Sequence, residues 1–510
     1  MRRIVLRVFL IALGSIAAGC SGQDAPQPVS TVLIENAVIV DGSGMDAYSG
    51  DVRIGDGRIV AVGALAPLAG ETVIDGLGRV LAPGFIDTHS HGDRTLFDDL
   101  DALGATSQGI TTIVVGQDGG SPYPLADFAA RLEATPPAIN VASYAGHNTL
   151  RGLVLGEDFR RTASADEVEQ MRQMLLAELE SGALGLATGL EYDPGIYSHP
   201  SEVVALAQAA ADAGGRYISH VRSEDRWFFD AIDEIIDIGR ATGMPVQVSH
   251  IKLSMRSLWG KAPELVAKLD AARAEGIDIT ADLYPYDAWQ SNLMVLLPER
   301  DPTDRKAVEF VLDEIVPAEG LLITRFPPDP SVEGKRLPEI AALRETDHVS
   351  ALMDLLQAAD RAAREAGGSV DSMIGTSMEQ ADIDLLWLWE HTNLCTDGVL
   401  TYTHPRGRGS FTRVLGRYLR ERRLLDLETT IRKMSGLAAD HMGFADRGYI
   451  RPGLAADLVL FDPDTIIDHA TMEDPLALST GVLRVWVGGE IVFENGAATD
   501  ARPGRFLRRQ

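Results

Sequence analysis

A short apolar run that ends in two histidines constrains this chain more than any other feature. Residues 84–88 have the pattern of a strand, and His89 and His91 follow it one residue apart. Side chains at positions i and i+2 of a strand point the same way, so both imidazoles project from its carboxyl end. Two neutral imidazoles on one side form half of a divalent metal site, whereas a bare His-x-His pair is more often two polar loop residues. The rest of the chain decides between these interpretations.

Strand-like runs alternate with helical patterns through the middle of the chain. The candidate strands are residues 84–88, 111–115, 140–145, 184–188, 216–219, 246–249, 277–283 and 394–396. Helical patterns lie between them at 167–180, 201–213, 230–241 and 262–275. Eight such runs predict an α/β fold, a (β/α)8 TIM-like barrel over residues 83–438. Pro-rich and charged helices at about 290–382 do not fit the barrel ring, and they predict an insertion near the active face.

Both ends of the chain show strands and turns. Residues 31–82 alternate apolar and polar positions between Asp-Gly turns, and residues 439–510 repeat this style. Neither end is long enough to form a sandwich alone, so we expect one small β-sandwich domain built from both termini. A chain of 510 residues has room for a large domain and a smaller one.

The first 30 residues indicate export. A basic start and a short apolar run end in small residues before Cys20, which is typical of a signal peptide over residues 1–20. Small residues directly before a cysteine resemble the lipobox of bacterial lipoproteins; the alternative is an ordinary signal peptide with a chance cysteine. Residues 21–30 then form a tether. We expect a periplasmic protein that is anchored to a bacterial membrane through a lipidated Cys20.

Charge and cysteine content narrow the possible partners. The net charge of -28 argues against nucleic acid and against adhesion to anionic lipid surfaces. Only two cysteines occur, Cys20 and Cys395, in contexts too different to suggest a disulfide. We interpret Cys395 as a buried packing residue. A small molecule is therefore the expected partner, with membrane contact only through Cys20.

Histidines and aspartates recur where the predicted strands end. These candidate ligands are His89, His91, Asp118, His220, His250 and Asp397. Catalytic groups of such barrels come from the carboxyl ends of strands, and only 11 histidines occur in the chain. This recurrence favours one or two divalent metal ions. Imidazole and carboxylate ligands suit zinc, and manganese, iron or nickel also fit them. The alternatives are a turn-stabilising Asp118 and a helix-capping or turn Asp397.

Several longer motifs add a family resemblance. They include Gly84-Phe-Ile-Asp-Thr-His-Ser-His91, Gly185-Leu-Ala-Thr-Gly-Leu-Glu-Tyr192, Ser219-His-Val-Arg222, Ser249-His-Ile-Lys252, Thr396-Asp-Gly398 and His404-Pro-Arg-Gly407. With these motifs the chain after the tether resembles the amidohydrolase superfamily, specifically the N-acyl-D-amino-acid deacylases (D-aminoacylases). The resemblance implies that His89, His91 and Asp397 face one metal position, and that His220 and His250 hold a second. Asp118 departs from the family pattern, because it stands where the family has a cysteine.

The resemblance also implies substrate contacts. Residues that match Tyr192 and Lys252 contact the substrate's α-carboxylate, as does a tyrosine near Tyr284 and Tyr286. A free carboxylate needs a cation and hydroxyl donors, which these side chains supply. Arg222 follows a strand end too, where it either contacts substrate or pairs with an acidic residue.

The sequence thus predicts a metal-dependent hydrolase in which Asp397 accepts a proton from water and returns it to the leaving amine. The expected reaction is hydrolysis of the amide bond of N-acyl-D-amino acids, releasing a carboxylate and a free D-amino acid; the D configuration comes from the resemblance. One alternative is a D-amino-acid-containing dipeptidase or a cyclic-amide hydrolase of the same superfamily. The other is a catalytically inactive, lipid-anchored binding protein.

Overall fold

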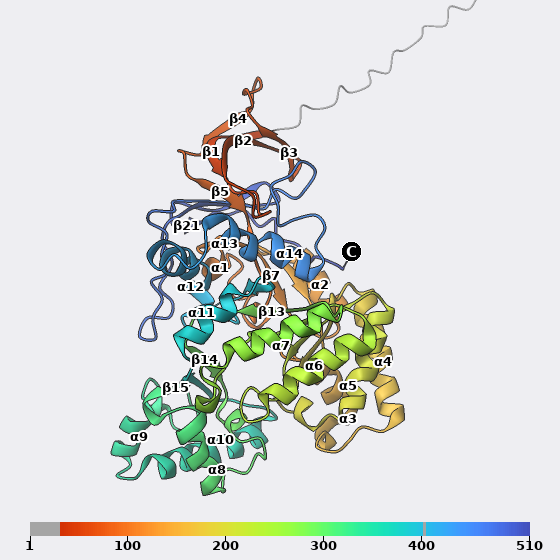
Figure 1. Ribbon diagram of the computed structural model, residues 1–510, viewed down its shortest axis with the longest axis vertical. Coiled ribbons are helices and arrows are strands. Elements are labelled where there is room, and N and C mark those ends of the chain that lie inside the picture. Colours follow the sequence, from red (N-terminus) through yellow and green to blue (C-terminus); the bar gives the residue numbers. More distant parts are fainter. Residues whose placement is uncertain (1–30, 401–403, 510) are drawn as a thin grey trace, which may run out of the picture.

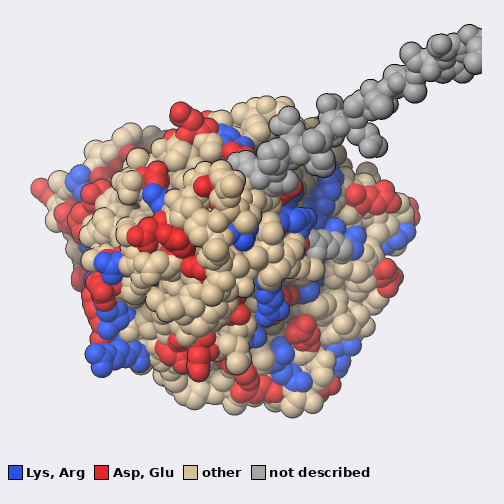
Figure 2. Space-filling model, turned by 90° about the horizontal axis from the view of Figure 1, so that it is seen from above, with Lys and Arg blue, Asp and Glu red and all other residues tan. Residues whose placement is uncertain are grey.

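The computed structural model describes residues 31–400 and 404–509. The predicted signal peptide, Cys20 and the tether therefore lie outside the described residues. Among the residues that are described, no helix is both long enough and apolar enough to cross a membrane. Acidic and basic side chains are interspersed over the face seen in Figure 2.

A nine-stranded sheet combines strands from both ends of the chain (Figure 1). Its main path runs β21-β20-β19-β18-β5-β1-β2-β3, and β4 pairs with β1. The strands are β1 (Val32–Ile39), β2 (Tyr48–Gly55), β3 (Arg58–Gly63), β4 (Thr72–Asp75), β5 (Val80–Pro83), β18 (Leu458–Phe461), β19 (Val482–Val487), β20 (Glu490–Glu494) and β21 (Ala497–Ala498). Asp56 and Gly57 both have positive φ in the β2–β3 turn, as a tight hairpin requires. The antiparallel pairing of β5 with β18 joins the two ends.

Parallel strands form the barrel below this sheet. They are β6 (Phe85–Asp87), β7 (Ile110–Val115), β8 (Asn140–Ser143), β9 (Ala145–Gly146), β10 (Gly185–Gly189), β11 (Arg216–His220), β12 (Val246–Val248), β13 (Ile279–Leu283) and β17 (Thr392–Leu394). One sheet runs β6-β7-β8 and the other β17-β13-β12-β11-β10-β9, with a single residue between β8 and β9. A parallel bridge between Ser90 and Gly398 brings the first and last strands together. The predicted TIM-like barrel is confirmed.

Helices surround the barrel and connect its strands. They are α1 (Leu103–Thr106), α2 (Leu125–Ala134), α3 (His147–Leu155), α4 (Ala165–Glu180), α5 (Pro200–Asp212), α6 (Phe228–Thr242), α7 (Ala262–Ala274), α11 (Gln380–Leu388), α12 (Arg406–Arg413), α13 (Leu427–Met434) and α14 (Gly436–Met442). Local sequence explains the ends of several of them. Ser164 and Glu167 form a capping box at the start of α4, and Gly243 at φ 69° terminates α6.

An inserted unit extends from the barrel after β13 (Figure 1). It contains a three-stranded sheet in the order β14-β16-β15 and three helices. Its elements are β14 (Ala288–Ser291), α8 (Arg305–Phe310), β15 (Leu321–Arg325), α9 (Leu337–Leu343), α10 (His348–Ala366) and β16 (Ser372–Thr376). The unit has its own hydrophobic core, which also includes Tyr284, Tyr286 and Cys395 from the barrel. Through these residues the insertion packs directly behind the carboxyl ends of β13 and β17.

One buried ion pair ties the sheet to the barrel. The Asp457 carboxylate pairs with Arg447 and also accepts hydrogen bonds from Asn140 Nδ2 at 3.1 Å and from the Gly488 N–H at 2.7 Å.

We expect Asp457→Ala to destabilise the protein by about 3–5 kcal/mol, because the buried Arg447 guanidinium loses its counter-charge. Asp464→Ala, at a side chain that is 83% exposed, is the control and costs less than about 0.5 kcal/mol. Equal urea midpoints, followed by circular dichroism, would contradict this prediction.

Candidate metal centre

Six ligand-type side chains meet at the carboxyl ends of the barrel strands. His89 and His91 follow β6, Asp118 follows β7, and His220 is the last residue of β11. His250 follows β12, and Asp397 follows β17. The strands are parallel, so their carboxyl ends lie at one face of the barrel. The structure brings all six predicted ligands together there, and each histidine among them is at most 7% exposed.

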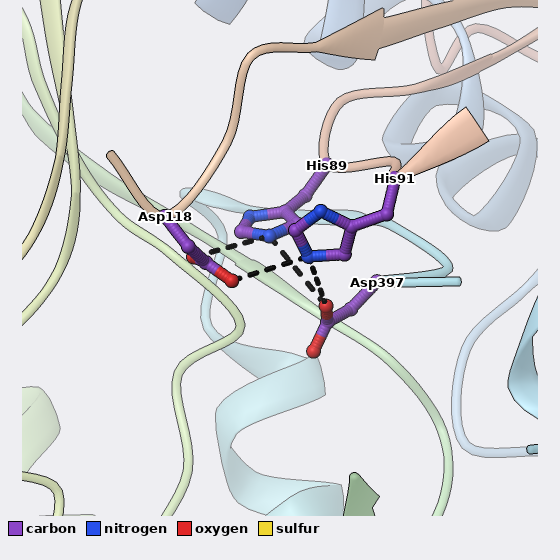
Figure 3. Close-up of side chains that lie close together, drawn as sticks. All are labelled: His89, His91, Asp118 and Asp397. Carbon is purple, nitrogen blue, oxygen red and sulfur yellow. Dashed lines mark hydrogen bonds and ion pairs between the residues drawn. The ribbon is translucent and has the colours of Figure 1, made fainter. Parts of the chain in front are cut away.

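The first group consists of two histidines and two aspartates (Figure 3). Asp397 Oδ1 lies 3.2 Å from His91 Nε2 and 3.6 Å from His89 Nε2. Asp118 faces the same two rings from the other side, at 3.2 Å from His91 Nε2 and 3.4 Å from His89 Nε2. Four ligand atoms therefore converge on one point.

The second group shares one member with the first. Asp118 Oδ1 lies 3.3 Å from His250 Nε2 and 4.0 Å from His220 Nδ1. The two rings are adjacent, with His220 Nδ1 3.1 Å from His250 Nε2. These three side chains form a second cluster of possible metal ligands. Asp118 therefore belongs to both groups: its Oδ2 faces His91, and its Oδ1 lies near both His89 and His250.

Two buried glutamates stand behind the histidines of the second group. Glu191 Oε2 lies 2.9 Å from His220 Nε2, and Glu224 Oε1 lies 3.2 Å from His250 Nδ1. A carboxylate that accepts from one ring nitrogen orients the imidazole and leaves the other nitrogen as the ligand. No local sequence pattern links Glu191 to His220 or Glu224 to His250, so these two contacts are visible only in the structure.

The residues fit a divalent metal ion. Both ring nitrogens of His89 are buried without a hydrogen-bond partner among the described residues, so this imidazole is free to ligate an ion. The backbone at three ligands is also unusual, with φ of 54° at Asp118, 35° at His250 and 47° at Asp397. Non-glycine residues rarely adopt this conformation, and such strain concentrates at functional sites. Nitrogen and carboxylate donors suit zinc and related ions.

The electrostatics keep both aspartates ionised. Burial alone would raise the pKa of Asp397, but the adjacent Arg406 guanidinium, 2.6 Å away, and His250 hold this pKa well below its ordinary value. Burial would also raise the pKa of Asp118, but the neighbouring His89 and His250 hold this pKa well below its ordinary value. Metal ligation needs deprotonated carboxylates, which this site supplies at neutral pH.

Cationic and phenolic groups adjoin the cluster. Lys252 Nζ lies 2.8 Å from His250 Nδ1 and 2.5 Å from Glu224 Oε1. Arg406 stacks over the Tyr284 ring, 4.7 Å from its centroid, and the buried Tyr284 hydroxyl has no partner among the described residues. These groups form a corner that can receive a carboxylate. The sequence gives Arg406 no role of its own, because its pairing with Asp397 depends on the barrel's closure.

The two other tyrosines predicted to contact substrate, Tyr192 and Tyr286, have different surroundings. The Tyr192 ring is 4.4 Å from the His220 ring, beside the cluster. Tyr286 packs against His404 at 5.6 Å and donates to the Pro405 carbonyl, so it supports the segment before Arg406. Contact of either tyrosine with substrate stays a prediction.

Arg222 is engaged elsewhere. Its guanidinium makes two 2.7 Å hydrogen bonds to Glu234 on α6 and a third to the Ser198 carbonyl. Of the two sequence alternatives, the structure therefore shows the ion pair, with Glu234 as the acid. A substrate contact of Arg222 has no support in this geometry and stays an untested prediction.

A barrel of this kind with a histidine–aspartate cluster at its carboxyl face defines a class of metal-dependent enzymes. Comparisons with known proteins narrow the class. The model of the amidohydrolase family matches residues 72–313 and 391–493. The N-acyl-D-glutamate deacylase of Alcaligenes xylosoxydans xylosoxydans is 38% identical over 94% of this chain and 96% of its own length. The D-aminoacylase of the same organism is 33% identical over 96% of this chain and 99% of its own.

Comparison with solved structures leads to the same family. A crystal structure of D-aminoacylase has a TM-score of 0.84 and 33% identity, covering 94% of this chain and all of that one. The N-acyl-D-glutamate deacylase of Bordetella bronchiseptica, solved with zinc and a phosphonate inhibitor, has a TM-score of 0.84 at 34% identity with the same coverage. The chain belongs to the amidohydrolase family and, within it, to the N-acyl-D-amino-acid deacylases. The resemblance seen in the sequence is confirmed.

The carboxylate behind His220 provides a test of the centre. Glu191→Gln keeps the side chain's size but weakens the hydrogen bond that orients the ring, so we expect metal affinity to fall about 10- to 100-fold. Competition with a chromogenic chelator measures this affinity, and mass spectrometry measures the bound metal. Glu169→Gln, on the exposed face of α4, is the matched control. Unchanged affinity in Glu191→Gln would exclude a role for this carboxylate in metal binding.

Proposed function

We propose that this chain hydrolyses the amide bond of N-acyl-D-amino acids, releasing a carboxylate and a free D-amino acid. The observation that carries the proposal is the complete ligand cluster with a buried carboxylate-binding corner beside it, at Lys252, Tyr284 and Arg406. Near full-length similarity to deacylases of N-acyl-D-glutamate and N-acyl-D-aspartate supports the class of substrate.

The cluster would hold divalent metal at two positions. His89, His91 and Asp397 would hold one ion and His220 and His250 the other, with Asp118 between them. A bound ion supplies an acidified water and a polarised scissile carbonyl. We propose zinc as the native metal, because the donor set suits it and a related deacylase was solved with zinc.

Asp397 is placed to move the proton. Its Oδ1 faces the ligand rings, whereas the Arg406 guanidinium pairs with its Oδ2. The pairing holds the carboxylate ionised, so it can accept a proton from the attacking water and return it to the leaving amine.

The corner would bind the substrate's α-carboxylate. Lys252 and Arg406 supply charge, and the Tyr284 hydroxyl, which has no partner among the described residues, supplies a hydrogen-bond donor. Charge-assisted bonds of this kind are roughly twice as strong as neutral ones, and they orient the amino acid relative to the metal positions. The corner explains why an N-acyl amino acid suits this site better than a simple amide.

The proposal predicts stereoselective hydrolysis. The zinc-supplemented protein should hydrolyse N-acetyl-D-amino acids and leave the matched L series untouched, as measured by release of free amino acid. Asp397→Asn removes the proton acceptor and lowers kcat by about 10²- to 10⁴-fold. Asp384→Asn, at a partly buried α11 carboxylate that is paired with Arg422 away from the cluster, is the control and should retain activity. Turnover of neither series by a metal-loaded protein would refute the proposal.

We also propose that the chain is exported and held at a bacterial membrane by a lipidated Cys20. The support is the pattern of residues 1–20, which lie outside the described structure. Cys20→Ser should move the expressed protein from the detergent phase to the aqueous phase on Triton X-114 partitioning, because an acylated chain stays with the detergent. Cys395→Ser, at a buried free thiol, should not change the partitioning. Identical partitioning of wild type and Cys20→Ser would exclude the anchor.

A further inference from the structure

A cavity adjoins the metal cluster. It has a volume of about 460 Å³ and is lined by His91, Arg94, Phe97, Ser121, Phe128 and Arg131, among others. Cavities of this size hold small organic ligands. His91 belongs both to this cavity and to the first ligand group, so the cavity begins at the metal centre. It is therefore placed to receive part of a molecule whose reacting bond lies at the cluster.

The cavity lies away from the carboxylate-binding corner. Its lining residues come from segments that follow β6, β7 and β9, which occupy one arc of the barrel. The corner is built by residues that follow β12, β13 and β17 on the other arc. An N-acyl amino acid has two parts, an acyl arm and an amino-acid arm, which lie on opposite sides of its scissile amide bond. With the amino-acid arm in the corner, the acyl arm extends past His91 into this cavity.

The cavity's walls are partly aromatic. The rings of Phe97 and Phe128 meet edge to face at 5.8 Å. The Arg131 guanidinium stacks over the Phe97 ring, 3.6 Å from its centroid. Apolar surface of this kind can cover a short hydrocarbon stem, while the guanidinium remains available at its edge.

The charges favour an anion. Neither Arg94 nor Arg131 makes a side-chain hydrogen bond or an ion pair with any residue that the structure describes. One carboxylate, that of Asp93, also lines the cavity, and its buried Oδ1 has no hydrogen-bond partner within the described ranges. Two guanidinium groups against one carboxylate leave a net positive charge. This excess stands out in a protein whose overall net charge is -28.

We infer that this cavity binds the acyl arm of the substrate, and that it selects acyl groups with a short apolar stem and a terminal carboxylate. The inference rests on the proposed function, whose substrate it defines more closely. The preferred substrates are half-amides of dicarboxylic acids, such as N-succinyl-D-amino acids. Hydrolysis breaks the acyl C–N bond and forms a C–O bond from water. The leaving amine takes one water proton, and the products are a dicarboxylate and a D-amino acid.

The test compares acyl groups of similar length on one D-amino acid. N-succinyl, N-butyryl and N-(4-aminobutyryl) derivatives place a negative, a neutral and a positive end in the cavity. We expect kcat/KM for the succinyl substrate to exceed that of the butyryl one by roughly three- to tenfold, because partly exposed ion pairs are individually modest. The cationic substrate should be the poorest. The succinyl preference should shrink in high salt, which screens exposed charges.

Variants of Arg94 and Arg131 test whether these two side chains cause the preference for the succinyl substrate. The double variant Arg94→Gln and Arg131→Gln should bring the succinyl-to-butyryl ratio close to one. The matched control is Arg172→Gln with Arg364→Gln, two exposed arginines on α4 and α10. A ratio that stays high in the double variant, or a preference for the butyryl or cationic substrate in the wild type, would overturn the inference.

Direct binding separates this inference from the proposed function. Calorimetric titration of the Asp397→Asn protein with the same ligands measures affinity without turnover. Tighter binding of the succinyl ligand, lost when the two arginines are replaced, supports the acyl cavity even if no deacylase activity is found. Equal dissociation constants for the succinyl and butyryl ligands refute the cavity assignment. Hydrolysis of N-acetyl-D-amino acids would still establish the proposed function in that case.

Discussion

The metal cluster depends on the contact that closes the barrel between its first and last strands. The Asp397 N–H donates to the His89 carbonyl at 2.8 Å, and the His91 N–H donates to the Gly398 carbonyl at 2.9 Å. Just below, the Asp87 carboxylate accepts two bonds, of 2.8 and 2.6 Å, from the residue before Asp397. Backbone pairing thus sets the register of three ligands from opposite ends of the barrel sequence. Their side chains converge because the two strand ends are hydrogen-bonded to each other.

The same framework holds strained ligands in place. Positive φ at Asp118, His250 and Asp397 costs about 1–3 kcal/mol at each position. The surrounding barrel offsets part of this cost, for example through the 2.5 Å hydrogen bond from the His250 N–H to the buried Asp282 carboxylate. Asp282 also accepts a hydrogen bond from Gln247 Nε2 at 2.6 Å. Such a rigid arrangement presents ligand atoms without reorganisation, which is the condition for strong electrostatic catalysis.

The strands and the six ligands could be predicted from the sequence, because strand periodicity and parallel topology together determine which side chains share a face. The sequence could not predict which acidic residue pairs with each basic side chain. Arg222 pairs with Glu234, one helix away, and Glu224 instead supports His250 and Lys252. These pairings depend on how helices sit against strands, and acidic residues are too common for spacing alone to select one. The cavity beside His91 could not be predicted either, since it is lined by segments that follow β6, β7 and β9, including residues of α2 and α3, and no local pattern joins them.

Asp118 shows how one substitution can change the character of the centre. The resemblance noted in the sequence implies a cysteine at this position in the family, and a thiolate would offer a single sulfur atom. A carboxylate offers two oxygens: Asp118 Oδ2 is 3.2 Å from His91 Nε2, and Oδ1 lies between the groups, 3.4 Å from His89 Nε2 and 3.3 Å from His250 Nε2. Oxygen is also a harder ligand than sulfur, so the second position loses its one soft donor. The two groups of possible ligands are therefore alike in donor chemistry, with nitrogen and oxygen atoms only, and the Asp118 side chain belongs to both.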